Sequence, residues 1–171
     1  MGKESIEKTD DSKQNSKEYV KLPFDKIVRI LIMNRSYQGI YHSELCVSGS
    51  EGMLIDINGD EKELKPGSEY ILKASDFKKN NTITIRSQGT GTLQIHNLER
   101  KDSPQYRGIL ECYPDSGGIV VVNELSVEEY LYGVVPSEMP SSYPEEALKA
   151  QAISARTYTY FHKQEYAYPQ W

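Results

Sequence analysis

The sequence has no apolar stretch approaching the ~18 residues that a membrane-spanning helix needs, because its longest hydrophobic run, residues 27–33, is interrupted by Arg29. The first 20 residues also lack the apolar core of a secretory signal. Cysteine is scarce: Cys46 and Cys112 lie far apart and form no C-x-x-C pattern, so they indicate no redox compartment. Basic residues number 20 against 25 acidic ones, so we expect no nucleic-acid partner.

The remaining composition is sufficient for one domain with a modest core. Of 171 residues, 37% are hydrophobic, and the mean hydropathy is −0.63. Residues 1–20 hold four lysines against five acids and few apolar groups. Too little surface can be buried there to offset the entropy of ordering. We therefore predict a disordered tether at residues 1–20 and a domain over residues 21–171.

Acidic and aromatic residues are concentrated in the last third of the chain. Residues 105–171 carry a net charge of −5 and contain nine of the 13 tyrosines and the single tryptophan. Aromatic rings cover the apolar faces of sugars, so this surface suits neutral or cationic ligands and sugars in particular. The alternative is that these tyrosines are ordinary core and interface residues.

Short β-type runs separated by turn residues fill the region from residue 24 to residue 122. They lie at residues 27–33, 40–47, 53–57, 70–74, 82–86, 92–96, 107–112 and 119–123. Asn58 and Gly59 favour a two-residue hairpin turn after the third run. The spacing predicts an α+β fold, in which a mostly antiparallel region of short strands is followed by two helices.

The first helix is predicted at residues 126–135. Ser126 and Glu129 form a capping box, and Leu125 and Tyr130 occupy the positions of a hydrophobic staple. Proline disfavours helical geometry in the residue before it, so the helix should end before Pro136.

The second helix is predicted at residues 142–163, beginning with a capping box at Ser142 and Glu145. Its alanines and other apolar residues spread around most of the circumference, which predicts burial on several sides. A buried arginine, Arg156, then needs a partner. Either it pairs with Glu128 or Glu129 on the first helix, or it orients a substrate or a catalytic carboxylate.

Glu138 lies between Pro136 and Pro140, on an expected elbow between the two helices with apolar neighbours. A carboxylate in apolar surroundings can stay protonated near neutral pH, as a general acid must. The alternative is that Glu138 only favours the positive end of the following helix or caps its N–H groups.

Metal ligation is a weaker hypothesis. His42, Cys46, His96 and Cys112 could be assembled into a zinc site, but their spacing does not require one. His162 fits a residue that stabilises a helix C-terminus better than a ligand. We therefore expect neither a metal nor a cofactor.

Residues 118–160 closely resemble the SpoIID/LytB family, named for stage II sporulation protein D and the amidase enhancer LytB. The words that match are VVNELSVEEYLYGVVPSEMP and YPEEALKAQAISARTY. Residues 21–117 are similar only in general character to the variable β region of that family, and residues 118–171 form the motif-bearing core.

The resemblance implies a peptidoglycan-remodelling protein, a lytic transglycosylase that cleaves glycan strands stripped of stem peptides and leaves 1,6-anhydro-N-acetylmuramic acid ends. It implies that Glu138 is the catalytic acid/base and that Arg156 orients it or binds substrate. Tyr158 and Tyr160 would line the groove. The alternative is a non-catalytic wall-binding or amidase-enhancing module with the same fold.

The resemblance also implies an extracytoplasmic location, in the cell wall or beside the engulfing membrane, and partners among glycan strands, a cell-wall amidase and sporulation engulfment proteins. Two departures stand out. Family members usually carry an N-terminal apolar anchor, and their domain usually continues past the A-R-T-Y word. We therefore expect a C-terminally truncated member that has its acid/base but lacks part of its cleft.

Overall fold

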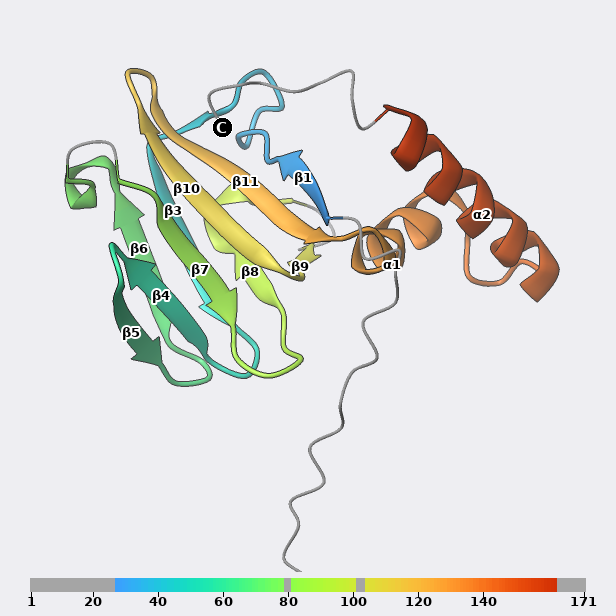
Figure 1. Ribbon diagram of the computed structural model, residues 1–171, viewed down its shortest axis with the longest axis horizontal. Helices are drawn as coiled ribbons and strands as arrows, with labels where there is room; N and C mark the ends of the chain where they lie inside the picture. Colours follow the sequence, from blue (N-terminus) through green and yellow to red (C-terminus); the bar gives the residue numbers. More distant parts are fainter. Residues whose placement is uncertain (1–26, 79–80, 101–103, 163–171) are drawn as a thin grey trace, which may run out of the picture.

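The computed structural model describes residues 27–78, 81–100 and 104–162, which form two antiparallel β-sheets followed by two α-helices (Figure 1). The larger sheet has the order β1-β11-β10-β7-β4-β5, with β2 paired to β11, and the smaller has the order β6-β3-β8-β9. The predicted α+β fold is therefore confirmed. The strands are β1 (Ile27–Leu31), β2 (Tyr41–His42), β3 (Glu44–Gly49), β4 (Met53–Ile57), β5 (Asp60–Leu64), β6 (Glu69–Lys73), β7 (Ile83–Ser87), β8 (Leu93–Ile95), β9 (Gln105–Tyr106), β10 (Ile109–Asp115) and β11 (Gly118–Ser126).

The main hydrophobic core contains side chains from both sheets. Strand residues alternate between two faces, so Leu45 and Val47 of β3 enter the same buried cluster as Ile83 and Ile85 of β7. All four are fully buried. Burial of such a side chain stabilises the folded state by about 1.5–3 kcal/mol, so this cluster stabilises the two sheets against which the helices lie.

The predicted hairpin turn is confirmed between β4 and β5. Asn58 and Gly59 have φ values of 61° and 88°, and the Gly59 N–H donates to the Asp56 carboxylate at 2.6 Å. β5 was not predicted, because its sequence, DEKEL, is charged at four of its five positions. The turn and the pairing with β4 specify this strand, not hydrophobic alternation.

The first helix, α1 (Val127–Glu138), is longer than predicted. Its expected end before Pro136 is wrong, because that proline is accommodated in the last turn. Pro136 removes one backbone N–H from the helix, but the Ser137 hydroxyl donates to the Gly133 carbonyl at 2.7 Å and adds a hydrogen bond there.

The helix ends instead at the second proline of the predicted elbow. Met139, the residue before Pro140, is extended with φ −141° and ψ 124°, which is the geometry that a following proline favours. Glu138 is consequently the last residue of α1 and does not lie on a loop.

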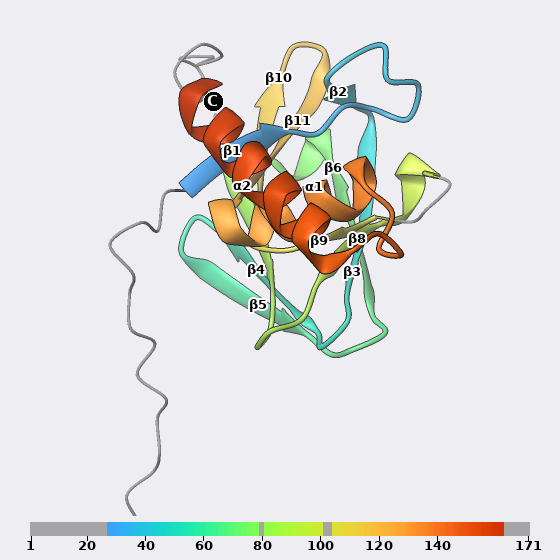
Figure 2. The same cartoon turned by 90° about the vertical axis from the view of Figure 1, so that its right-hand side faces the viewer.

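The second helix, α2 (Glu145–His162), begins three residues after its predicted start. The backbone N–H groups of Ala147 and Leu148 donate to the Pro144 carbonyl. The predicted burial on several sides is wrong, since none of the described side chains of α2 is buried. A half-buried stripe, residues 147–148, 151–152, 155–156 and 159–160, recurs about every turn, and α1 lies between α2 and the sheets (Figures 1 and 2).

The predicted tether, residues 1–20, and the final residues 163–171 lie outside the described part of the chain. Within the described residues, no helix has both the length and the hydrophobicity needed to cross a membrane.

Candidate functional site

A cleft of about 480 Å³ separates α1 from the nearby edges of the two sheets. One wall comes from β1, β9 and β11 with the residues after β9, and includes Ile30, Tyr106, Arg107, Asn123 and Leu125. The other wall is α1, which contributes Glu129, Tyr130, Tyr132, Gly133, Val134, Ser137 and Glu138. The cleft therefore combines two carboxylates and one guanidinium with three phenol rings.

The helix wall is anchored at its first turn. The Ser126 Oγ accepts from the Glu129 N–H at 3.2 Å, and the Glu129 carboxylate accepts from the Ser126 N–H at 3.3 Å, so the predicted capping box is confirmed. Leu125, Val127 and Leu131 join Val28 of β1 in a second buried cluster. Because the anchor is continuous with β11, the helix cannot tilt away from the sheet without exposing these side chains.

Glu138 lies at the far end of this wall and lines the cleft. Its side chain is exposed, so the expected burial in apolar surroundings is wrong. The cause is the extra turn of α1, which carries Glu138 past the apolar residues that precede it. Glu138 is nevertheless near the half-buried Tyr130, whose phenol has a pKa raised by burial first and then by the charge of Glu138 and by Tyr158.

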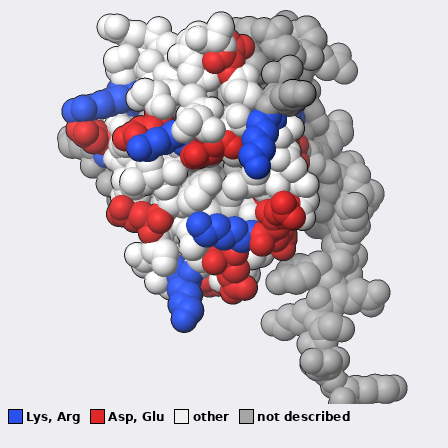
Figure 3. All heavy atoms as spheres, turned by 90° about the vertical axis from the view of Figure 1, so that its left-hand side faces the viewer, with Lys and Arg blue, Asp and Glu red and all other residues white. Residues whose placement is uncertain are grey.

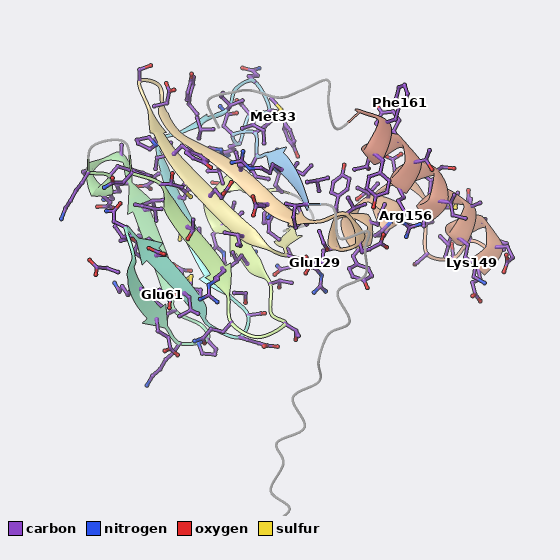
Figure 4. All side chains as sticks on the ribbon, in the orientation of Figure 1. Met33, Glu61, Glu129, Lys149, Arg156 and Phe161 are labelled. Atoms are coloured by element: carbon purple, nitrogen blue, oxygen red, sulfur yellow. The ribbon has the colours of Figure 1, made fainter. Side chains whose placement is uncertain are left out.

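Arg156 pairs with α1, as one of the two sequence interpretations predicted. Its Nε donates to Glu128 Oε1 at 2.7 Å and its Nη2 donates to Oε2 at 2.6 Å. The hydrogen bonds lower the pKa of the Glu128 carboxyl and raise that of the Arg156 guanidinium. Figure 4 shows Arg156 at the junction of the two helices, where it joins α2 to α1 and does not line the cleft.

The two predicted tyrosines of α2 occupy different surroundings. Tyr160 is half-buried and packs against the second buried cluster. Tyr158 is 66% exposed and lines a shallow depression on α2 with Ile153 and Phe161. Of the four predicted site residues, Glu138 lines the cleft. Arg156, Tyr158 and Tyr160 lie on α2 and do not line it.

Two residues of the cleft escaped sequence reasoning. The guanidinium of Arg107 lies 5.5 Å from the ring centroid of Tyr132, across the cleft. Arg107 belongs to the β region, where no motif distinguished it from other basic residues, and its pairing with a helix residue depends on the tertiary fold. Tyr132 lay within the recognised motif, and its 69% exposure is what marks it as a surface ring.

The four residues considered for zinc are engaged separately. His42 Nε2 donates to the Ile32 carbonyl at 2.9 Å, and burial lowers the pKa of its imidazole. His96 Nε2 is hydrogen-bonded to Ser48 at 2.8 Å. Cys46 is half-buried and Cys112 fully buried. Among the described residues, no three histidine, cysteine, aspartate or glutamate side chains are grouped suitably for a metal ion.

On the face opposite the helices, the charges of the described residues do not form a competing site. Figure 3 shows the face turned away from the helices, where cationic and anionic side chains are interleaved. Ion pairs such as Arg86–Glu61, at 2.6 Å, link β7 to β5, the two strands on either side of β4 in the larger sheet. Interleaved signs give no extended field that would attract a polyanion.

Comparison with known proteins agrees with the predicted resemblance. Residues 115–170 match the family model described as SpoIID, stage II sporulation protein. An uncharacterised protein of Brachyspira hyodysenteriae is 50% identical over 58 residues, covering 34% of this chain and 16% of that protein. Stage II sporulation protein D of Bacillus subtilis is 57% identical over 37 residues, covering 22% of this chain and 11% of that protein.

The amidase enhancer of Bacillus subtilis is 37% identical over 110 residues, covering 58% of this chain and 15% of that protein. The matched segments thus span less than a fifth of each of these relatives. No solved structure matches the chain significantly. The end of the β10–β11 hairpin, α1 with its cleft wall, and α2 all fall within residues 115–170, the part of the chain that matches the SpoIID family model.

Proposed function

We propose that this protein remodels peptidoglycan outside the cytoplasm, and that its cleft binds a glycan strand which Glu138 cleaves as a lytic transglycosylase. The observation that carries the proposal is the position of Glu138. This carboxylate of the S-E-M-P word lines a cleft of about 480 Å³ that also holds aromatic rings. Rings and a carboxylate are what recognition and cleavage of a sugar polymer require.

The arrangement of carboxylates favours a mechanism with one acid/base. Besides Glu138, the described cleft lining includes Glu129. It lies nine residues earlier on α1, about 13 Å along the axis, and its carboxylate is held by the Ser126 N–H. Hydrolysis with two carboxylates needs the carboxyl groups roughly 5–9.5 Å apart, which is shorter than the rise along the axis between these two residues.

In the proposed reaction, the Glu138 carboxyl gives its proton to the glycosidic oxygen as the bond between that oxygen and C1 breaks. The C6 hydroxyl of the same sugar then attacks C1, and the Glu138 carboxylate accepts the hydroxyl proton. The product is a 1,6-anhydro ring, and no water is consumed. A strand in the cleft would displace water from around Glu138, which disfavours hydrolysis as a side reaction.

The test is release of anhydro-ended sugars from amidase-treated peptidoglycan, measured by mass spectrometry. We expect release by the wild-type chain and at least a 100-fold loss with Glu138→Gln, in line with the removal of a general acid. Glu146→Gln is the control, because Glu146 is an exposed carboxylate at the start of α2. Equal release by a folded Glu138→Gln variant would disprove the role of Glu138.

A second candidate function is a non-catalytic wall-binding or amidase-enhancing module. It is favoured by the 37% identity to a protein named amidase enhancer and by the position of Arg156, which is bound to Glu128 outside the cleft. Such a module would bind denuded glycan without releasing products, and would increase the rate of a cell-wall amidase added to the same assay. Binding to sporulation engulfment proteins is part of this second candidate function.

A further inference from the structure

Arg107 is the cationic group of the cleft, and the described residues provide it with no carboxylate partner. The side chain is half-buried, lines the cleft, and contacts the Tyr132 ring at 5.5 Å. Other arginines of the protein, such as Arg29 and Arg156, are paired with glutamates. An arginine held in a cleft without an ion pair is available for an anionic group of a ligand.

The backbone around Arg107 is held by contacts with β11. Asn123, which is 94% buried, donates from Nδ2 to the carbonyls of Arg107 at 2.8 Å and Ile109 at 3.2 Å. Between them, Gly108 has φ 74°, and a Cβ at that position would lie 2.2 Å from the Glu124 carbonyl oxygen. These contacts restrict the backbone beside Arg107 and hold that residue in the wall of the cleft.

The charges of the cleft indicate what kind of ligand Arg107 would recognise. The ring of Tyr132 is 69% exposed and can cover the apolar face of a pyranose. A neutral sugar would require nothing more. A sugar bearing a carboxylate would be repelled by Glu129 and Glu138, and a guanidinium beside the ring offsets that repulsion and forms charge-assisted hydrogen bonds.

We propose that Arg107 and Tyr132 form a subsite for a pyranose that carries a free carboxylate. The inference rests on the proposed function, and in a peptidoglycan strand the matching sugar is N-acetylmuramic acid whose lactyl carboxyl is free, not joined to a peptide by an amide bond. Tyr132 lies six residues from Glu138, about 9 Å along α1. The subsite therefore selects the sugar beside the reacting bond, and Arg107 is a specificity-determining residue, not a catalytic one.

The experiment is an NMR titration of the ¹⁵N-labelled 171-residue chain with N-acetylmuramic acid and with its lactyl methyl ester. The two ligands differ in one negative charge. We expect the acid to bind about tenfold more tightly than the ester, with chemical-shift changes at the amides of residues 106–108 and 131–133.

Three variants separate the contributions. Arg107→Gln should bind the acid no more tightly than the ester, since the repulsion by Glu129 and Glu138 is then no longer offset, whereas Arg107→Lys should retain part of the preference because it keeps the charge. Tyr132→Leu should weaken both ligands by the same factor. Arg86→Gln is the control, since Arg86 pairs with Glu61 on the larger sheet.

Equal affinities for acid and ester in the wild-type chain, an unchanged preference in Arg107→Gln, or the absence of acid-induced shifts at those amides would each overturn the proposal. Failure of the catalytic proposal gives a different pattern. Glu138→Gln should keep the preference for the acid while releasing no anhydro product. A wild-type chain that prefers the acid but releases nothing refutes cleavage and leaves the subsite supported.

Discussion

The stability contributed by the ion pair between Arg156 and Glu128 tests whether the arginine of α2 has a structural role. Exposed ion pairs contribute about 0.2–1 kcal/mol, and this one has two parallel hydrogen bonds of 2.7 and 2.6 Å. The side chains are 35% and 52% exposed, so solvent screens part of the attraction. We therefore expect a coupling of about 1 kcal/mol between Arg156→Gln and Glu128→Gln, and 1 kcal/mol corresponds to about 2–4 °C in Tm for a chain of this size.

The assay is a double-mutant cycle by urea unfolding, followed by circular dichroism and by amide hydrogen exchange of α2. The pair lowers the pKa of Glu128. Its stabilisation should be complete at pH values above the pKa of a glutamate in the unfolded chain and should disappear as the pH falls through the lower, folded value. The pKa of Arg156 is raised, so Arg156 stays protonated throughout and contributes no second transition.

A coupling below about 0.3 kcal/mol at neutral pH, or one that persists after Glu128 is protonated, would refute this reasoning. The same variants test the functional alternative. If Arg156 acts only through Glu128, the two single variants should bind denuded glycan equally. If Arg156→Gln alone weakens glycan binding or cleavage, the arginine also serves the substrate.

Three further predictions follow from particular residues. Gly108→Ala should lower the free energy of unfolding by about 3 kcal/mol or more, because the positive φ of 74° is combined with a collision between the new Cβ and the backbone. Gly59→Ala, with φ 88° and open space around it, should lower it by about 1 kcal/mol. Equal losses in urea unfolding would contradict the collision. Gly133→Ala should stabilise α1 by about 0.5–1 kcal/mol, since a Cβ there meets open space. Gly133→Phe should instead fill the cleft and weaken glycan binding in the NMR titration. Unchanged binding would place the ligand elsewhere. A thiol reagent should modify Cys46 in the native protein and Cys112 only after unfolding, because Cys112 is fully buried and burial raises the pKa of both thiols; two rapidly reacting thiols would contradict this.

Local chemistry was sufficient to predict much of the fold. The capping box at Ser126, the Asn58-Gly59 turn and the mostly antiparallel short strands each follow from residues close together in the chain, and all three are confirmed. The charged strand β5 could not be predicted this way, because its pairing partner specifies it. The continuation of α1 through Pro136 was missed for a related reason: a proline near a helix end removes one hydrogen bond, and whether the helix tolerates that loss depends on contacts such as the Ser137 hydroxyl bond.

The sequence by itself determined which part of the chain resembles the SpoIID family. Glu138, Arg156 and the words around them identify the family domain, because those words are contiguous and local. Only the tertiary structure decided which residues share a cleft. It separated Arg156 and Tyr160 from Glu138 through the packing of α2 on α1, and it brought Arg107 to Tyr132 from 25 positions away. Burial and cross-chain contacts depend on how helices and sheets pack, and no local pattern of residues encodes that packing.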